Sequence, residues 1–163
     1  MLRDMFVRYF TELPLAVDRV ERALCDTPTS WIPGLADEAN AHGERLLAKV
    51  GLGDRVRLTR RVVVDLGEPM RFPSRTIVPL RWRPATAGGL LPALDADIEA
   101  APLTPETTQL SMSARYMPPW GAVGNAVDRA LLHRVAEATV KDFLDRVGAR
   151  LTASATSVGG PSR

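Results

Sequence analysis

Two short segments of this chain alternate strictly between apolar and polar residues. Their apolar positions are Leu94, Ala96, Ile98 and Ala100 in the first, and Leu110, Met112, Ala114 and Tyr116 in the second. The positions between them hold Asp95, Asp97 and Glu99, and then Ser111, Ser113 and Arg115. Because successive side chains of a strand point to opposite faces, this pattern predicts two strands of an antiparallel sheet with one buried and one solvated face.

Other segments supply the rest of the predicted sheet. A first strand is expected over residues 5–12, an alternating segment begins at Asp54, and a further strand is expected over 72–83. The acidic face of the 94–100 strand fits between a strand carrying Arg81 and Arg83 and one carrying Arg115. Opposite charges on neighbouring strands support register. We therefore interpret these charges as a solvated sheet face and not as an active site.

A long amphipathic segment follows the sheet. Residues 122–151 contain no proline, and their glycines lie near the two ends. The apolar residues recur with helical spacing, which predicts one helix of roughly 30 residues, or about 45 Å at 1.5 Å per residue. A helix of this length needs a large apolar surface to lie on, and the sheet is the candidate.

The remaining segments complete a single α+β domain. Two helices are expected after the first strand, one from Pro14 to near Asp26 and one from Leu35 to Val50, with residues 31–34 as a turn or capping segment between them. We assign residues 1–151 to the domain. Residues 152–163, rich in Ser, Thr and Gly, are expected to form a disordered C-terminal tail.

Composition excludes several classes of protein. With 45% hydrophobic and 25% charged residues, the 163-residue chain has the composition of a globular protein. Its formal charge is only +2, and its basic residues are not clustered as they are on the binding face of a nucleic-acid-binding protein. Cys25 is the single cysteine, so neither an intrachain disulfide nor a thiolate metal cluster can form. No signal peptide or membrane span is evident, and we expect a cytoplasmic protein without a metal or cofactor.

The order of strand, two helices, antiparallel strands and long terminal helix resembles the START-like (SRPBCC, helix-grip) superfamily, which includes polyketide cyclase/dehydrase-like proteins. Residues 91–98, 113–121 and 135–139 are similar to the C-terminal half of uncharacterised actinobacterial members. The resemblance implies a curved sheet around the long C-terminal helix, with a cavity between them. The chain departs from the family in showing four strands after the helix pair, where six are common. The superfamily has no shared catalytic motif, so no reaction follows.

The resemblance also implies which residues line such a cavity. They come from the inward face of the sheet and from the long helix: Val62, Val64, Val78, Leu80, Trp82, Leu94, Ala96, Ile98, Leu110, Met112, Ala114, Tyr116, Leu132, Ala136, Val140 and Phe143. Alanines at inward positions leave volume where a filled core would favour larger residues. The alternative is that these alanines let the helix approach closely and leave no cavity.

Four residues could bring polar chemistry into that cavity. The buried tips of Tyr116 and Trp82 need a partner, which could be a ligand or a backbone group. Arg60 is in phase with the inward positions and could bind a ligand carboxylate, although a bulge could equally turn it outward. His133, like His42, is expected at the surface; if it faced the cavity it would be the best general-base candidate, and Tyr116 is the other catalytic candidate.

Three functions remain open from the sequence. The first is binding of a small hydrophobic molecule, lipid-like or of the aromatic polyketide type, by a monomer or homodimer. The second is an enzyme of the cyclase/dehydrase or hydrolase type that uses the same cavity. The third is a protein-interaction module without a ligand, which would require an exposed apolar patch.

Overall fold

The computed structural model describes residues 5–47, 49, 62–85, 93–117 and 129–157. Its elements in chain order are β1 (Met5–Leu13), α1 (Val17–Cys25), α2 (Pro28–Leu47), β2 (Val62–Leu66), β3 (Met70–Phe72), β4 (Arg75–Pro84), β5 (Ala93–Thr104), β6 (Thr107–Met117) and α3 (Arg129–Ser157). The two alternating segments are the strands β5 and β6, as predicted.

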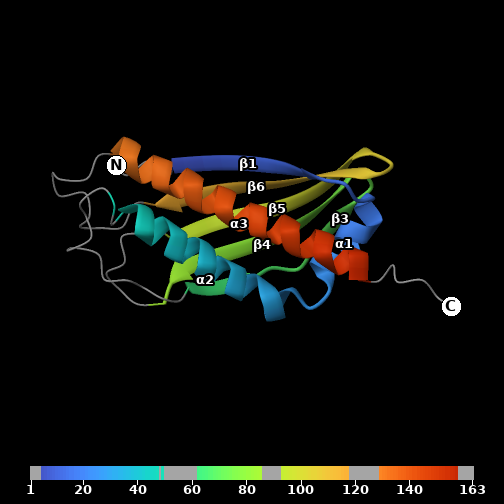
Figure 1. The fold of residues 1–163 in the computed structure, drawn as a ribbon, viewed down its shortest axis with the longest axis horizontal. Helices are drawn as coiled ribbons and strands as arrows, with labels where there is room; N and C mark the ends of the chain where they lie inside the picture. The colour runs from blue at the N-terminus through green and yellow to red at the C-terminus, as the bar shows by residue number, and fades with distance from the viewer. Residues whose placement is uncertain (1–4, 48, 50–61, 86–92, 118–128, 158–163) are drawn as a thin grey trace.

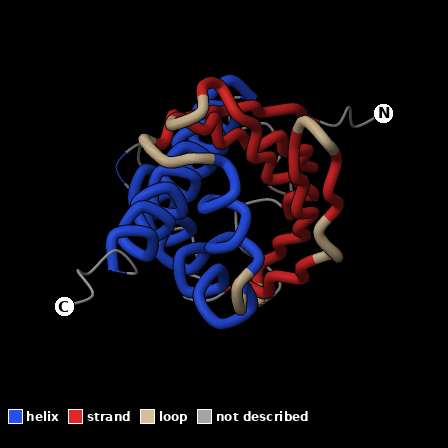
Figure 2. Tube along the Cα trace, turned by 90° about the vertical axis from the view of Figure 1, so that its right-hand side faces the viewer, coloured by secondary structure: helices blue, strands red, loops and turns tan. Residues whose placement is uncertain are grey.

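All strand pairs are antiparallel and form one six-stranded sheet. Its order is β1-β6-β5-β4-β2, with β3 paired to β4. Figure 1 shows α3 crossing one face of the sheet beside α2, and Figure 2 shows the strands curving around the helices. This is the helix-grip α+β fold that the sequence predicts.

The two faces of the sheet differ as the alternation requires. Along β5 and β6 the predicted inward residues are all buried, whereas Asp95, Asp97 and Arg115 are exposed. On the outer face Asp95 lies in register between Arg81 and Arg115. The Arg81 Nε donates to Asp95 Oδ1 at 2.7 Å, so the predicted charge complementarity is confirmed. Because both side chains are largely exposed, this pair sets register more than it stabilises the fold.

The strand count corrects the prediction. Among the described residues five strands follow the helix pair, and not four, because a short strand ending at Phe72 precedes the strand that begins at Arg75. Pro73 and Ser74 form a tight turn, so that residues 70–72 fold back onto β4. Proline and serine favour turns, which the apolar alternation of the neighbouring residues concealed. Of the strand expected to begin at Asp54, the structure describes only the later part, which is β2. Residues 54–61 lie outside the described residues.

Residues 31–34, expected to be a turn, lie inside α2. Ile32 and Ala36 are fully buried on the side of α2 that meets the core. A proline within a helix costs roughly 3 kcal/mol, and burying an isoleucine returns about 1.5–3 kcal/mol, so the core contact at Ile32 offsets most of the cost of Pro33. Tertiary packing thus extends the helix upstream. The expected end at Val50 lies outside the described residues.

The tail prediction is wrong for residues 152–157, which continue α3. Leu151 is buried, and the hydroxyls of Thr152 and Thr156 donate to the carbonyls of Gly148 and Thr152 at 2.9 and 3.1 Å. These bonds satisfy side chains that would otherwise compete with the helix, so threonine is tolerated in its last turns. Residues 122–128, expected to open this helix, lie outside the described residues.

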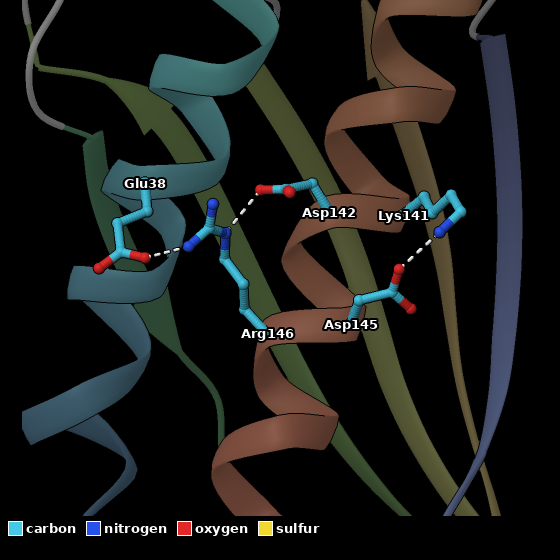
Figure 3. A network of polar contacts seen from close by, with 5 residues as sticks. All are labelled: Glu38, Lys141, Asp142, Asp145 and Arg146. Atoms are coloured by element: carbon cyan, nitrogen blue, oxygen red, sulfur yellow. Dashed lines mark hydrogen bonds and ion pairs between the residues drawn. The ribbon is translucent and has the colours of Figure 1, made fainter.

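Charged side chains of α3 pair with one another and with Glu38 of α2 (Figure 3). Towards α2, Arg146 donates to Asp142 at 2.7 Å and also pairs with Glu38, and the hydrogen bond to Asp142 is the main reason that the pKa of Arg146 is raised. Towards β1, Asp145 accepts from Lys141 at 2.6 Å and from the Tyr9 hydroxyl at 2.8 Å. Burial, reinforced by the bond to Asp145, raises the pKa of Tyr9.

Gly148 lets α3 approach β1 closely, which gives a test of this packing. A Cβ at Gly148 would lie 3.0 Å from Leu13 Cδ2 and 3.7 Å from Thr11 Cγ2. We expect Gly148→Val to lower the free energy of unfolding by about 1–3 kcal/mol, since its branched side chain overpacks this contact. Urea denaturation measures the loss. The matched control is Ala149→Val at the exposed neighbour, and an equal loss in both variants would contradict the packing described.

Candidate functional site

The described residues predicted to line the cavity gather in the interior between the sheet and α3. All but one belong to, or pack against, one continuous core. The exception is Leu132, which packs with Leu47 and Val135 in a second cluster. The remaining predicted lining residue, Arg60, lies outside the described residues. The inward orientation predicted for the sheet residues is therefore observed from Val62 onward.

The interior differs between its two ends. Around Ile98, Met112 and Phe143 the side chains are completely buried. Towards the other end, Val62 and Leu132 keep 7% and 5% of their surface exposed. Val64, on the same face of β2 as Val62, is only half-buried. The interior is closed at the end near α1 and less completely closed where β6 ends and α3 begins.

Two predicted lining residues contact each other across the interior. The rings of Trp82 on β4 and Phe143 on α3 lie 5.4 Å apart between centroids, edge to face at 75°. This contact fills the space between β4 and the middle of α3. Next to Trp82 on the inner face, Ala96 and Ala114 lie directly opposite each other in register. A cavity over these alanines remains a prediction, bounded on one side by the aromatic pair.

A chain of polar contacts among three side chains, of which the first is a hydrogen bond, runs from the interior towards solvent at the less closed end. The Tyr116 hydroxyl lies 3.0 Å from His133 Nδ1, and His133 Nε2 lies 3.2 Å from Glu137 Oε1. The rings of Tyr116 and His133 are stacked, 6.3 Å apart and inclined by 25°. Tyr116 is buried, His133 is one-third exposed, and Glu137 is more than half exposed.

The geometry assigns a role to each member of this chain. A carboxylate can only accept, so Glu137 beside Nε2 favours the tautomer that carries its hydrogen on Nε2. Nδ1 of His133 is then left as an acceptor for the Tyr116 hydroxyl. The chain can move a proton between the interior and the solvent-exposed side of α3 without separating charge in the apolar core.

His133 keeps one third of its side chain exposed, and its ring also reaches Tyr116 on the inner face of the sheet. Sequence reasoning did not single out Glu137. The signal was available, since His133 and Glu137 are four residues apart and such residues are neighbours on a helix. His42, the other histidine, is half-buried in α2.

A groove lies on the opposite, outer face of the sheet. Its volume is about 670 Å³, and it is lined by side chains and backbone of β1, β2, β4, β5 and β6, among them Phe6, Asp65, Arg81, Asp97 and Arg115. Most of these side chains are exposed, as the sequence predicts for this face. Two residues of the predicted cavity, Leu80 and Ala96, also line this groove.

Within the described ranges, no three His, Cys, Asp or Glu side chains are grouped as metal ligands. None of the described helices is long and apolar enough to cross a membrane.

Comparison with known proteins supports the fold. No protein-family model and no curated protein matches the chain. A conserved protein of Geobacillus kaustophilus has a similar structure, with a TM-score of 0.50 and 15% identity over 90% of this chain and 95% of that one. At this identity the likeness shows a shared fold. The chain has the helix-grip α+β fold that its sequence predicts.

Two further solved structures align with lower scores. The Zhui aromatase/cyclase from Streptomyces sp. R1128 has a TM-score of 0.48 and 16% identity, over 98% of this chain and all of that one. A START superfamily protein from Mycobacterium smegmatis has a TM-score of 0.44 and 10% identity, over 94% and 98% of the two chains.

The chain of polar contacts predicts the tautomer of His133. We expect neutral His133 to carry its proton on Nε2, since Glu137 is placed to accept it. Long-range ¹H–¹⁵N NMR of the imidazole distinguishes the two tautomers. Glu137→Gln, which can also donate, should weaken the preference, whereas Glu106→Gln in the β5–β6 turn should leave it unchanged. A wild-type His133 protonated on Nδ1 would contradict the proposed direction of the chain.

Proposed function

We propose that this protein binds a small, mainly apolar molecule that carries a hydroxyl or carbonyl group. The site is the less closed end of the interior, with the polar group of the ligand placed at Tyr116. The observation that carries the proposal is the chain from Tyr116 through His133 to Glu137, which brings polar atoms to the apolar inner face of the sheet. Apolar sites with a few convergent polar groups are typical of small-molecule binding.

The chemistry of Tyr116 fits such a ligand. A phenol hydroxyl both donates and accepts, so a ligand oxygen can bond to it while the contact with His133 is kept or exchanged. Around it, Leu94 and Ala96 offer apolar contacts, and Trp82 adds a large buried ring. The ligand would therefore be held mainly by burial of its apolar surface and oriented by one or two hydrogen bonds.

Small residues supply the room that this function needs. Ala96 and Ala114 face each other at the centre of the inner face, and Ala136 lies on the buried side of α3. A cavity of a few hundred cubic ångströms there would suit a lipid-like or aromatic molecule. Such a carrier would act in the cytoplasm, the compartment that the lone Cys25 thiol favours.

The same chain of residues favours a second candidate function, an enzyme of the cyclase/dehydrase type. Here the substrate would lose a proton from the carbon next to a carbonyl. That proton would pass to the Tyr116 oxygen as the phenol proton moves to His133 Nδ1, and the Glu137 carboxylate would stabilise the resulting imidazolium. The negative charge would remain on the substrate as an enolate, ready to attack a second carbonyl or expel a hydroxide.

Substitution of Ala114 separates a cavity from a filled core. If the space over Ala114 is open, Ala114→Leu should change the free energy of unfolding by less than about 1 kcal/mol. It should also remove the ligand that native mass spectrometry detects on protein purified from its own host. The matched control is Ala100→Leu at the closed end, where overpacking should cost about 1–3 kcal/mol. Equal destabilisation in both variants, with no ligand on the wild type, would rule out the cavity.

Deuterium exchange separates a carrier from an enzyme. When the co-purified molecule is incubated with protein in D₂O, an enzyme of the proposed type exchanges the hydrogens next to its carbonyl, and a carrier does not. We expect Tyr116→Phe to slow this exchange about 10²-fold or more, in the range typical of losing a general acid or base, while the ligand still binds. Mass spectrometry of the extracted ligand measures the rate. Exchange that is no faster with wild type than without protein would leave the carrier as the function.

A further inference from the structure

Strand β1 ends the sheet on one side. Among the described residues it pairs only with β6, from Met5 opposite Tyr116 to Leu13 opposite Thr108. Figure 1 shows it as the outermost strand along the whole length of the sheet. Its second edge therefore presents backbone amides and carbonyls to which no described strand is paired. Such an edge is a ready template for another strand.

The outer face of β1 is unusually apolar for an edge strand. Phe6 and Phe10 are exposed over 56% and 57% of their surfaces, and they flank Arg8 on the same face. Proteins commonly protect such edges with charges, proline or a covering element. Here two aromatic side chains stand beside an edge to which no described strand is paired.

The charges of β1 identify the covering chain. Arg8 and Glu12 lie on the outer face at equal distances on either side of Phe10. Their neighbours on β6 are Ser113 and Gln109, and no ion pair within the described part of the chain involves either charge. When a second copy pairs antiparallel about Phe10, the Arg8 of each copy lies opposite the Glu12 of the other. The strand is thus complementary to itself.

Other registers lose this complementarity. Centring the pair on Arg8 places the two arginines opposite each other, which is repulsive. Centring it on Tyr9 places Arg8 opposite Phe10 and leaves both charges unpaired. Only the register about Phe10 forms two ion pairs and brings two phenylalanines together, and aromatic cross-strand pairs stabilise a sheet.

We infer that the protein forms a two-fold symmetric homodimer in which β1 of one copy pairs antiparallel with β1 of the other, centred on Phe10. The two sheets become continuous, and Phe6 and Phe10 are partly covered. On the inner face, α3 supports β1 through the bond between Tyr9 and Asp145, so the edge is held in place before pairing. This inference is independent of the proposed ligand, because it uses the outer face and the free edge of the sheet.

Disulfide trapping tests the register directly. In a Cys25→Ser background, Phe10→Cys places two thiols opposite each other across the two-fold axis, where paired Cα atoms lie about 4.5–5.5 Å apart and a disulfide can form. Phe6→Cys is the matched control, because its two copies would lie about 26 Å apart along the strands at 3.3 Å per residue. Rapid cross-linking of the first variant alone supports the inference. Cross-linking of neither variant, or of both equally, would overturn it.

Charge exchange tests the ion pairs. In sedimentation velocity, Arg8→Glu and Glu12→Arg should each raise the dimer dissociation constant about tenfold or more, since each creates two like-charge contacts. The double variant restores opposite charges and should return the constant to within about threefold of wild type. Glu106→Arg, in the β5–β6 turn, controls for a change of net charge. A wild type that stays monomeric at 100 µM, or single variants that behave like the control, would refute the dimer.

Discussion

The burial of α3 against the inner face of the curved sheet is the contact on which the rest of the structure depends. Most of a 29-residue helix's stability in water comes from packing of its apolar side, and here that side meets the sheet and α2. The sheet depends on the helix in turn, because Ile98, Leu110 and Met112 would otherwise expose a continuous apolar surface. Gly148 and Arg146 then fix where the helix lies, by close approach to β1 and by pairing with α2.

Much of this architecture could be predicted because the signals were local and periodic. The alternation around Leu94 and Tyr116 identified two strands and their inward faces, and the charges of Arg81 and Asp95 identified neighbouring strands. One error came where a tertiary contact overrides local preference, since burial of Ile32 carries α2 through Pro33 and no window of sequence shows that burial. The other error was local: Thr152 is tolerated in α3 because its hydroxyl bonds back to the Gly148 carbonyl.

The candidate site was predictable only in part, for a different reason. The inward direction of Tyr116 followed from strand alternation, but whether His133 reaches it depends on the angle at which α3 crosses the sheet. That angle is set by packing, which no pattern encodes. Cavity volume is harder still to predict, since it depends on how rotamers fill space, as the contact between Trp82 and Phe143 shows. Glu137 could have been found from its spacing to His133 alone.

The position of the polar chain follows from the cost of burying charge. A proton-accepting group in the closed end, near Phe143, would have to stay neutral or find a buried partner. At the start of α3 the imidazole of His133 is one-third exposed, so solvent and Glu137 can stabilise its charged form while its other nitrogen meets Tyr116. Stability and polar side chains are thus located at different ends of the interior. The fully buried apolar side chains at the closed end stabilise the fold, and polar side chains at the end where β6 meets α3 reduce that stability little.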